Sequence, residues 1–190
     1  MIGWQDAPPA PLAKPLPELY AQLAAIDVIA LDACLGDGPV LLLSNLAQAS
    51  AARHVAGRRN EQGGLLVGTP YALDPAASDV DVVLVRAAVP AEDFSSSGVS
   101  LRMETGVWDR ARAALAPGEL VVGWFHSHPG LGAFFSDTDR RTQAAFFHHP
   151  FSVGWVIDPF GDEEAWFLGG AAEPLGTERV LRPTSARVDQ

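Results

Sequence analysis

From residue 40 onward, apolar residues recur along the chain in two patterns that alternate. Short runs dense in Val, Leu and Ile predict strands, and longer stretches with apolar residues three or four apart predict helices. The predicted strands cover residues 40–43, 64–68, 80–88, 99–103, 121–128, 153–157 and 165–168. The predicted helices cover residues 45–56, 105–115 and 136–147. This alternation predicts a single α/β domain with a central mixed sheet flanked by helices.

Proline and glycine mark the ends of several of these segments. Pro117-Gly118 ends the second predicted helix, and Asp158-Pro159 begins a turn between the last two strands. Prolines are dense between residues 8 and 17, which predicts an extended N-terminal tail over residues 1–17. Apolar periodicity weakens towards the C-terminus. We therefore expect the domain to span residues 18–175 and a C-terminal tail to span residues 176–190.

Composition narrows the class of partner. The 190 residues include 13 Lys and Arg against 23 Asp and Glu, a formal net charge of −10. Such a surface repels phosphate backbones, so nucleic acid is not expected as a partner. The longest apolar runs, residues 28–31 and 40–43, are too short to span a bilayer, so no membrane association is expected. Cys34 is the only cysteine and the N-terminus lacks a secretory pattern, so we expect a cytoplasmic protein. The oligomeric state stays open.

The candidate chemistry begins with His126 and His128. Strand positions i and i+2 face the same side of a sheet, so both imidazoles can meet one ion while Ser127 faces away. Asp139 follows eleven residues after His128, and Ser136 precedes it by three. Two histidines and one aspartate form the three-ligand set that leaves zinc a fourth position open for water.

Two of the polar residues also have a plainer interpretation. Ser136 and Asp139 resemble a helix capping box, in which serine accepts from a backbone amide and aspartate complements the helix dipole. Capping and metal binding can coexist, because a carboxylate has two oxygens. Glu61 lies upstream, before Gly63 and Gly64, and could be an exposed surface residue. A water activated by zinc nevertheless needs a base that is not a ligand, and glutamate is the usual choice.

Together these residues resemble the JAMM (MPN+) metalloprotease family, whose fold is the JAB domain. The pattern His-Ser/Thr-His, seven residues, Ser, two residues, Asp is met without a gap, and residues 61–68 (Glu-Gln-Gly-Gly-Leu-Leu-Val-Gly) match the upstream segment. The resemblance covers roughly residues 40–168. It implies one catalytic zinc ion held by His126, His128 and Asp139. It further implies that Glu61 acts as general base and that Ser136 hydrogen-bonds the developing oxyanion.

The same resemblance implies a zinc-dependent isopeptidase that removes ubiquitin or a ubiquitin-like protein from its target. Conjugates of such modifiers would then be the partners. Hydrolysis by an activated water needs no covalent intermediate, so Cys34 and Ser127 are not expected to act as nucleophiles. Two alternatives remain open. One is a peptidase that processes a sulfur-carrier-type protein, and the other is a non-catalytic MPN scaffold subunit.

Overall fold

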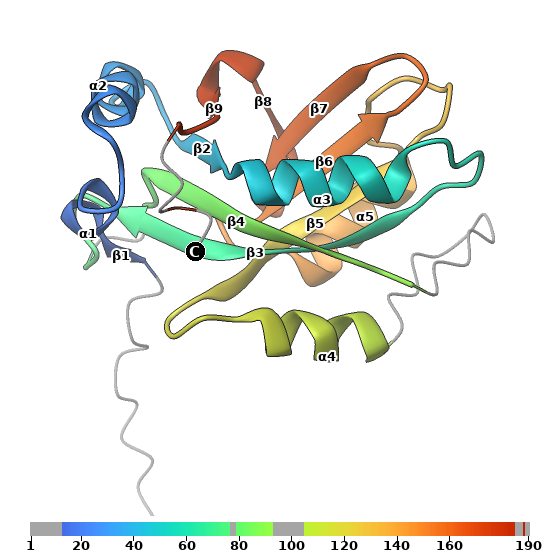
Figure 1. Cartoon of the computed structure of the whole chain (residues 1–190), viewed down its shortest axis with the longest axis horizontal. Helices are drawn as coiled ribbons and strands as arrows, with labels where there is room; N and C mark the ends of the chain where they lie inside the picture. The colour runs from blue at the N-terminus through green and yellow to red at the C-terminus, as the bar shows by residue number, and fades with distance from the viewer. Residues whose placement is uncertain (1–12, 77–78, 93–104, 185–187, 189–190) are drawn as a thin grey trace, which may run out of the picture.

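The computed structural model describes residues 13–76, 79–92, 105–184 and 188, which form a mixed sheet with helices on both faces (Figure 1). The strands are β1 (Lys14–Pro15), β2 (Val40–Leu43), β3 (Gly63–Ala72), β4 (Val82–Pro90), β5 (Leu120–Ser127), β6 (Val153–Asp158), β7 (Glu163–Leu168), β8 (Glu173–Leu175) and β9 (Val180–Leu181). The helices are α1 (Leu16–Tyr20), α2 (Ala25–Cys34), α3 (Asn45–Val55), α4 (Thr105–Ala114) and α5 (Asp137–Phe146), with a 3-10 turn at Thr177–Arg179. The α/β class predicted from the sequence is confirmed.

The strand order places β5 inside the sheet. The order is β8-β7-β6-β5-β3-β4-β2-β9, and β1 pairs with β3 outside this path. β5 runs antiparallel to β3 and parallel to β6, so the sheet is mixed, as predicted. The strand that carries His126 is therefore held by hydrogen bonds on both sides, which fixes the direction of its side chains.

One face of the sheet is covered by α3, which lies across it in Figure 1. Ala47, Ala51 and Val55 recur every four residues, and all three are buried against the sheet. Their small side chains let the helix backbone approach closely. Ser44 caps the helix, because its Oγ accepts from the amide of Ala47 at 3.0 Å.

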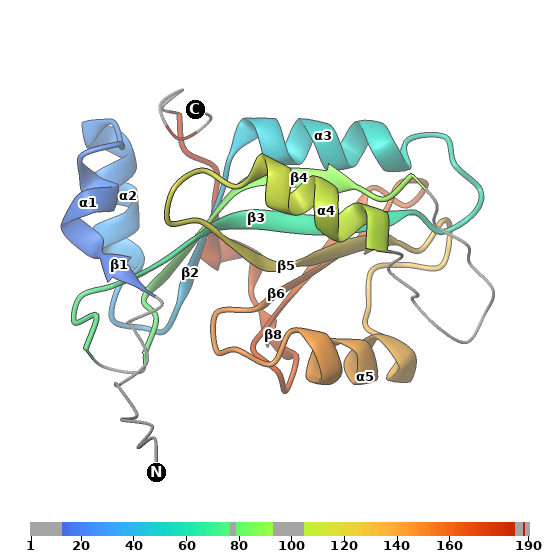
Figure 2. The ribbon, with the colours of Figure 1, turned by 90° about the horizontal axis from the view of Figure 1, so that it is seen from below.

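The opposite face is covered by α4 and α5, as the view from below shows (Figure 2). Val107 and Ala111 of α4 pack into a second apolar cluster that includes Trp124 of β5. Phe135 and Phe147, which flank α5 in sequence, belong to the same cluster. This second face carries the polar residues singled out in the sequence.

The expected tail boundaries differ from the structure. Lys14 and Pro15 pair with the end of β3, and Leu16 in α1 is fully buried. Proline does not prevent this packing, since Pro15 ends a two-residue strand and Pro17 occupies the first turn of α1, where no intrahelical amide bond is lost. At the other end, β9 pairs in parallel with β2, so residues beyond 175 also add to the sheet.

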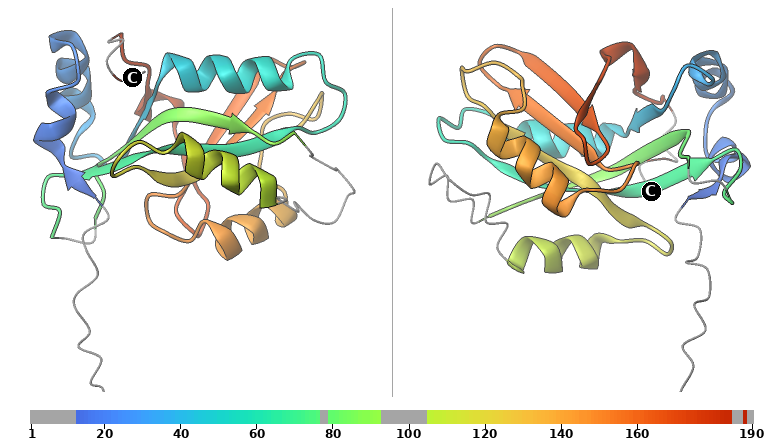
Figure 3. Two further views of the ribbon diagram at one scale, coloured as in Figure 1. Left: turned by 60° about the horizontal axis from the view of Figure 1, so that its bottom comes forward. Right: turned by 180° about the vertical axis from the view of Figure 1, so that it is seen from behind.

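Two further predictions need comment. The sequence did not predict α2, which packs with α1 at one end of the sheet (Figure 3). Its residues are mostly apolar around the whole helix, and Ile26 and Ile29 face solvent, so no amphipathic stripe marks it. The predicted strand at 99–103 lies outside the described residues. None of the helices in the described part of the chain is long and apolar enough to cross a membrane.

Candidate metal centre

Two elements bring the metal-binding candidates together. His126 lies on β5, and His128 follows the strand directly, with its amide donating to the carbonyl of Ile157 at 2.9 Å. Asp139 lies in the first turn of α5. All three side chains are buried, with no more than 5% of any residue exposed. The structure therefore places two imidazoles and a carboxylate together beneath the surface.

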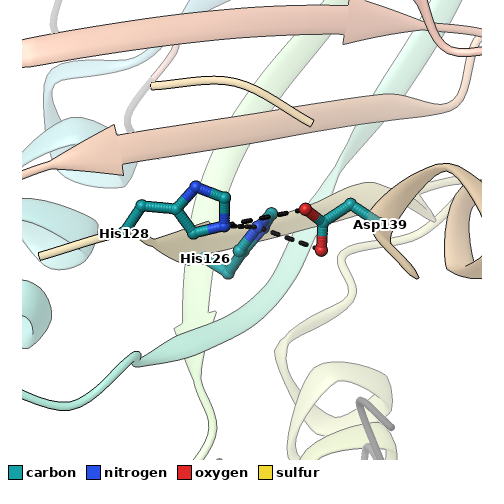
Figure 4. A group of neighbouring side chains, drawn as sticks. All are labelled: His126, His128 and Asp139. Carbon is teal, nitrogen blue, oxygen red and sulfur yellow. Dashed lines mark hydrogen bonds and ion pairs between the residues drawn. The ribbon is translucent and has the colours of Figure 1, made fainter. Parts of the chain in front are cut away.

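The ligand atoms of these residues converge on one point (Figure 4). The two Nε2 atoms of His126 and His128 lie 3.1 Å apart. His126 Nε2 lies 3.3 Å from Asp139 Oδ1, and His128 Nε2 lies 3.6 Å from Asp139 Oδ2. Within the described residues, these three form the group of histidines and carboxylates able to hold a metal ion, and Glu61 is not part of it.

This donor set fits zinc. A tetrahedral zinc ion with bonds of about 2.0–2.1 Å separates its ligand atoms by about 3.3–3.4 Å. The three observed separations, 3.1, 3.3 and 3.6 Å, lie on either side of that value. Neutral imidazole nitrogen and carboxylate oxygen are both zinc ligands, and three protein ligands leave one coordination position for water.

Protonation states favour a cation at this point. Burial lowers the pKa of His128, and the neighbouring His126 lowers it further, which keeps the imidazole neutral and free to bind a metal. Burial alone would raise the pKa of Asp139. His126 and the hydrogen bonds from Ser136 outweigh that effect and bring the pKa to about 2. The carboxylate is therefore ionised at neutral pH.

Ser136 both caps α5 and positions Asp139. The serine Oγ accepts from the amide of Asp139 at 3.2 Å, and the amide of Ser136 donates to Asp139 Oδ2 at 2.7 Å. These two bonds form the capping box expected from the sequence. The hydroxyl of Ser136 also donates to Asp139 Oδ2, at 2.7 Å. Because both donors engage Oδ2, Oδ1 remains directed towards His126, so the cap does not compete with a metal-binding role.

Glu61 lies on the metal-binding face of the sheet, next to the cluster. Gly63 of β3 pairs with His126, and the amide of Ser127 donates to the carbonyl of Gln62 at 2.8 Å. Continued for two residues, this antiparallel register places Glu61 opposite His128, on the same face. The charge of Glu61 also acts on His128, favouring its protonated form against the larger effect of burial.

Two residues that the sequence analysis did not assign to the site orient the His126 ring. Trp124 stacks on it with 4.5 Å between ring centroids and 7° between planes. The Trp124 indole N–H donates to Gln143 Oε1 at 2.6 Å, and Gln143 is fully buried in α5. The Gln143 amide group in turn donates to the carbonyls of Ser152 and Gly169. Their signal in the sequence is a glutamine on the predicted helix four residues beyond Asp139 and a tryptophan two residues before His126.

Comparison with known proteins identifies the family. The family described as prokaryotic homologs of the JAB domain matches residues 43–169, two-thirds of the chain. The 26S proteasome non-ATPase regulatory subunit 14 of Caenorhabditis elegans is 34% identical over 155 residues, which cover 78% of this chain and 45% of that protein. The Saccharomyces cerevisiae ubiquitin carboxyl-terminal hydrolase RPN11 is 45% identical over 42 residues, which cover 22% of this chain and 14% of that protein. This chain therefore spans less than half the length of these relatives.

A solved structure supports the fold. The solution structure of protein DSY2949 from Desulfitobacterium hafniense superposes with a TM-score of 0.55 at 22% identity, covering 75% of this chain and 92% of that one. At that level of identity the similarity concerns the fold alone. The family match covers every strand and helix that brings the three converging residues together. The chain belongs to the JAB domain family, among its prokaryotic homologs.

Proposed function

We propose that this protein is a zinc-dependent isopeptidase that hydrolyses the bond between a ubiquitin-like modifier, or ubiquitin itself, and its target. The observation that carries the proposal is the convergence of His126, His128 and Asp139 at zinc-ligand separations, with Glu61 beside them but outside the ligand group. A scaffold subunit has no need of this buried polar cluster, which favours catalysis over that alternative.

His126, His128 and Asp139 would hold the zinc ion. When bound, zinc polarises the scissile carbonyl and lowers the pKa of water to about 7, so that hydroxide is available at neutral pH. The protein's part is to keep the three ligand atoms fixed. Stacking of Trp124 on His126 and the capping box at Ser136 both serve that purpose.

Glu61 acts as the general base. Its carboxylate removes a proton from the attacking water and delivers it to the lysine amine that leaves. Proton transfer by a positioned side chain contributes roughly 10²- to 10⁴-fold to the rate. A half-buried position at the end of a strand suits this task, because the carboxylate can meet both water and substrate.

Ser136 donates a hydrogen bond to the oxyanion that forms when water adds to the scissile carbonyl. Its hydroxyl carries a single proton, which is directed to Asp139 Oδ2 in the structure. Rotation about the Cβ–Oγ bond redirects that proton without moving the backbone. Asp139 Oδ2 then keeps the bond from the Ser136 amide, so the carboxylate remains held while the hydroxyl serves the substrate.

The choice of substrate rests on the relatives. One is named as a ubiquitin carboxyl-terminal hydrolase and another as a proteasome regulatory subunit. The family match to prokaryotic homologs favours a ubiquitin-like modifier of that origin. A cytoplasmic location with no nucleic-acid or membrane partner agrees with the net charge of −10 and the single cysteine.

The test is an isopeptide-linked conjugate of such a modifier, incubated with the zinc-loaded protein and two variants. Glu61→Gln should retain zinc and lose about 10²- to 10⁴-fold in kcat. Glu173→Gln, which removes an exposed carboxylate on β8, should behave as wild type. A Glu61→Gln variant with wild-type turnover would rule out the base assigned here. Cleavage only of a linear sulfur-carrier precursor would favour the processing peptidase instead.

A further inference from the structure

Asp158 joins the loop after His128 to the turn between β6 and β7. It is the last residue of β6, and only 3% of it is exposed. Its Oδ1 accepts from the amides of Gly130 at 2.8 Å and Phe160 at 2.9 Å. Its Oδ2 accepts from the amide of Gly132 at 2.9 Å. One buried carboxylate therefore binds three amides from two separate loops.

The loop that follows His128 depends on this carboxylate for its shape. Gly130 and Gly132 have φ values of +74° and +86°, a left-handed conformation that glycine adopts readily. Alternating amides in such a loop converge and make an anion-binding concavity, which Asp158 fills. Leu131, between the two glycines, is 66% exposed and contributes little packing. Hydrogen bonds to Asp158 therefore hold this loop more than apolar contacts do.

The same loop bears on His128. The amide of Leu131 donates to the carbonyl of His128 at 3.1 Å, which closes the loop back onto the histidine. Phe134, further along, packs its ring 4.9 Å from the His128 ring. The His128 amide is bound to the carbonyl of Ile157, the residue before Asp158. The end of β6 thus holds His128 directly through its backbone and indirectly through the loop.

We propose that Asp158 is a positioning residue for the metal centre: its carboxylate fixes residues 129–132 and through them the His128 imidazole. This inference rests on the proposed function, because it assigns Asp158 a role towards zinc binding. Residues that orient metal ligands from outside the coordination shell commonly affect metal affinity or activity by about 10- to 100-fold. The amide of Gly130, together with those of Phe160 and Gly132, lowers the pKa of Asp158 to about 2. The acceptor is therefore charged at neutral pH.

A purely structural carboxylate elsewhere provides the matched control. Asp27 in α2 is buried to a similar degree, with 7% exposed. It accepts from the amide of Thr184 at 2.9 Å and from its hydroxyl at 3.0 Å. Asp27 belongs to the end of the sheet covered by α1 and α2, away from the metal centre (Figure 2). Asp27→Asn and Asp158→Asn thus remove the same charge from two buried anchors, only one of which touches the loop after His128.

The experiment measures zinc affinity by competition with a chromophoric chelator, and amide hydrogen exchange in the zinc-free proteins. Asp158→Asn replaces one acceptor oxygen by an N–H donor that meets another N–H. We expect its zinc dissociation constant to rise about 10- to 100-fold. The amides of residues 130 and 132 should exchange faster. Asp158→Glu, which keeps the charge, should retain more affinity than Asp158→Asn. Asp27→Asn should lower thermal stability and leave zinc affinity unchanged.

Two results would overturn the inference while the proposed function stands. One is wild-type zinc affinity and turnover in a folded Asp158→Asn protein. The other is an equal loss of affinity in Asp27→Asn, which would show that general destabilisation weakens zinc binding. Wild-type protein that binds no zinc would instead overturn the proposed function and the role of Asp158 with it. Amide exchange, which needs no metal, would still decide whether the carboxylate holds the loop.

Discussion

Replacing Ser136 by alanine separates helix capping from catalysis, because the two roles differ greatly in magnitude. The substitution removes an Oγ that accepts from the amide of Asp139 and donates to its carboxylate. Loss of such a cap costs about 0.5–2 kcal/mol. In a chain of this length, 1 kcal/mol lowers the melting temperature by about 2–4 °C. Since domains are stable by about 5–15 kcal/mol, nearly every molecule remains folded.

A donor aimed at an oxyanion is worth much more in rate. Its removal typically lowers kcat about 10²- to 10³-fold, a loss that the small change in folded fraction cannot produce. We therefore expect Ser136→Ala to melt a few degrees lower and to lose about two to three orders of magnitude in kcat. Zinc should be retained, since the backbone amide of residue 136 still binds Asp139 Oδ2.

Ser44→Ala is the matched control. Ser44 caps α3 in the same way, with its Oγ 3.0 Å from the amide of Ala47, but on the face of the sheet opposite the metal centre. Its melting temperature should fall to a similar extent while kcat stays at the wild-type value. Calorimetry, metal analysis and steady-state cleavage of an isopeptide conjugate measure the three quantities. An equal, small loss of kcat in both variants would refute the role of the Ser136 hydroxyl as an oxyanion donor.

Three further changes have expected outcomes. Gly154→Ala should cost about 1–3 kcal/mol in chemical denaturation. Its new methyl group would lie 2.3 Å from a buried phenylalanine ring, so a variant as stable as wild type would contradict the packing described. Ser127→Ala removes the acceptor for the amide of Gln62 and should lower kcat through the base next to it, while zinc stoichiometry stays constant. Wild-type kcat would show that this bond does not position the base. Burial opposes ionisation of Glu119, but the pair with Arg86 outweighs it and lowers the pKa of Glu119. A depressed carboxyl pKa stabilises the fold above the unfolded value of about 4.3 and loses this effect as the pH falls further. The stability difference between wild type and Glu119→Gln should therefore be largest at neutral pH and shrink in acid, and a constant difference in urea denaturation across pH would contradict it.

The sequence predicted the parts of the fold that follow a regular period. The run Val40–Leu43 and the spacing of Ala47, Ala51 and Val55 reflect burial against the sheet, and the structure shows both elements. β3 is longer than its apolar run indicated, because it continues through Pro70 to pair with β1. The N-terminal segment was assigned to a tail because its prolines conceal Leu16, which is buried only through tertiary contacts.

The candidate site followed the same division. His126 and His128 share a face because a strand has a period of two, and Ser136 with Asp139 follows the spacing of a capping box. These are local rules, so the sequence alone could apply them. The contribution of Asp158 could not be predicted, because it depends on a pairing of β5 with β6 that no local pattern specifies.

Bound zinc per chain, measured in the wild-type protein and in Asp139→Ala, tests the central claim most directly. The account predicts about one zinc ion per wild-type chain and none in the variant, because the loss of one of three ligands leaves too few protein donors. Both proteins must be folded by circular dichroism, since the substitution also removes part of the α5 cap. A folded wild-type protein that takes up no zinc after reconstitution would contradict the claim and reduce Ser136 and Asp139 to a helix cap.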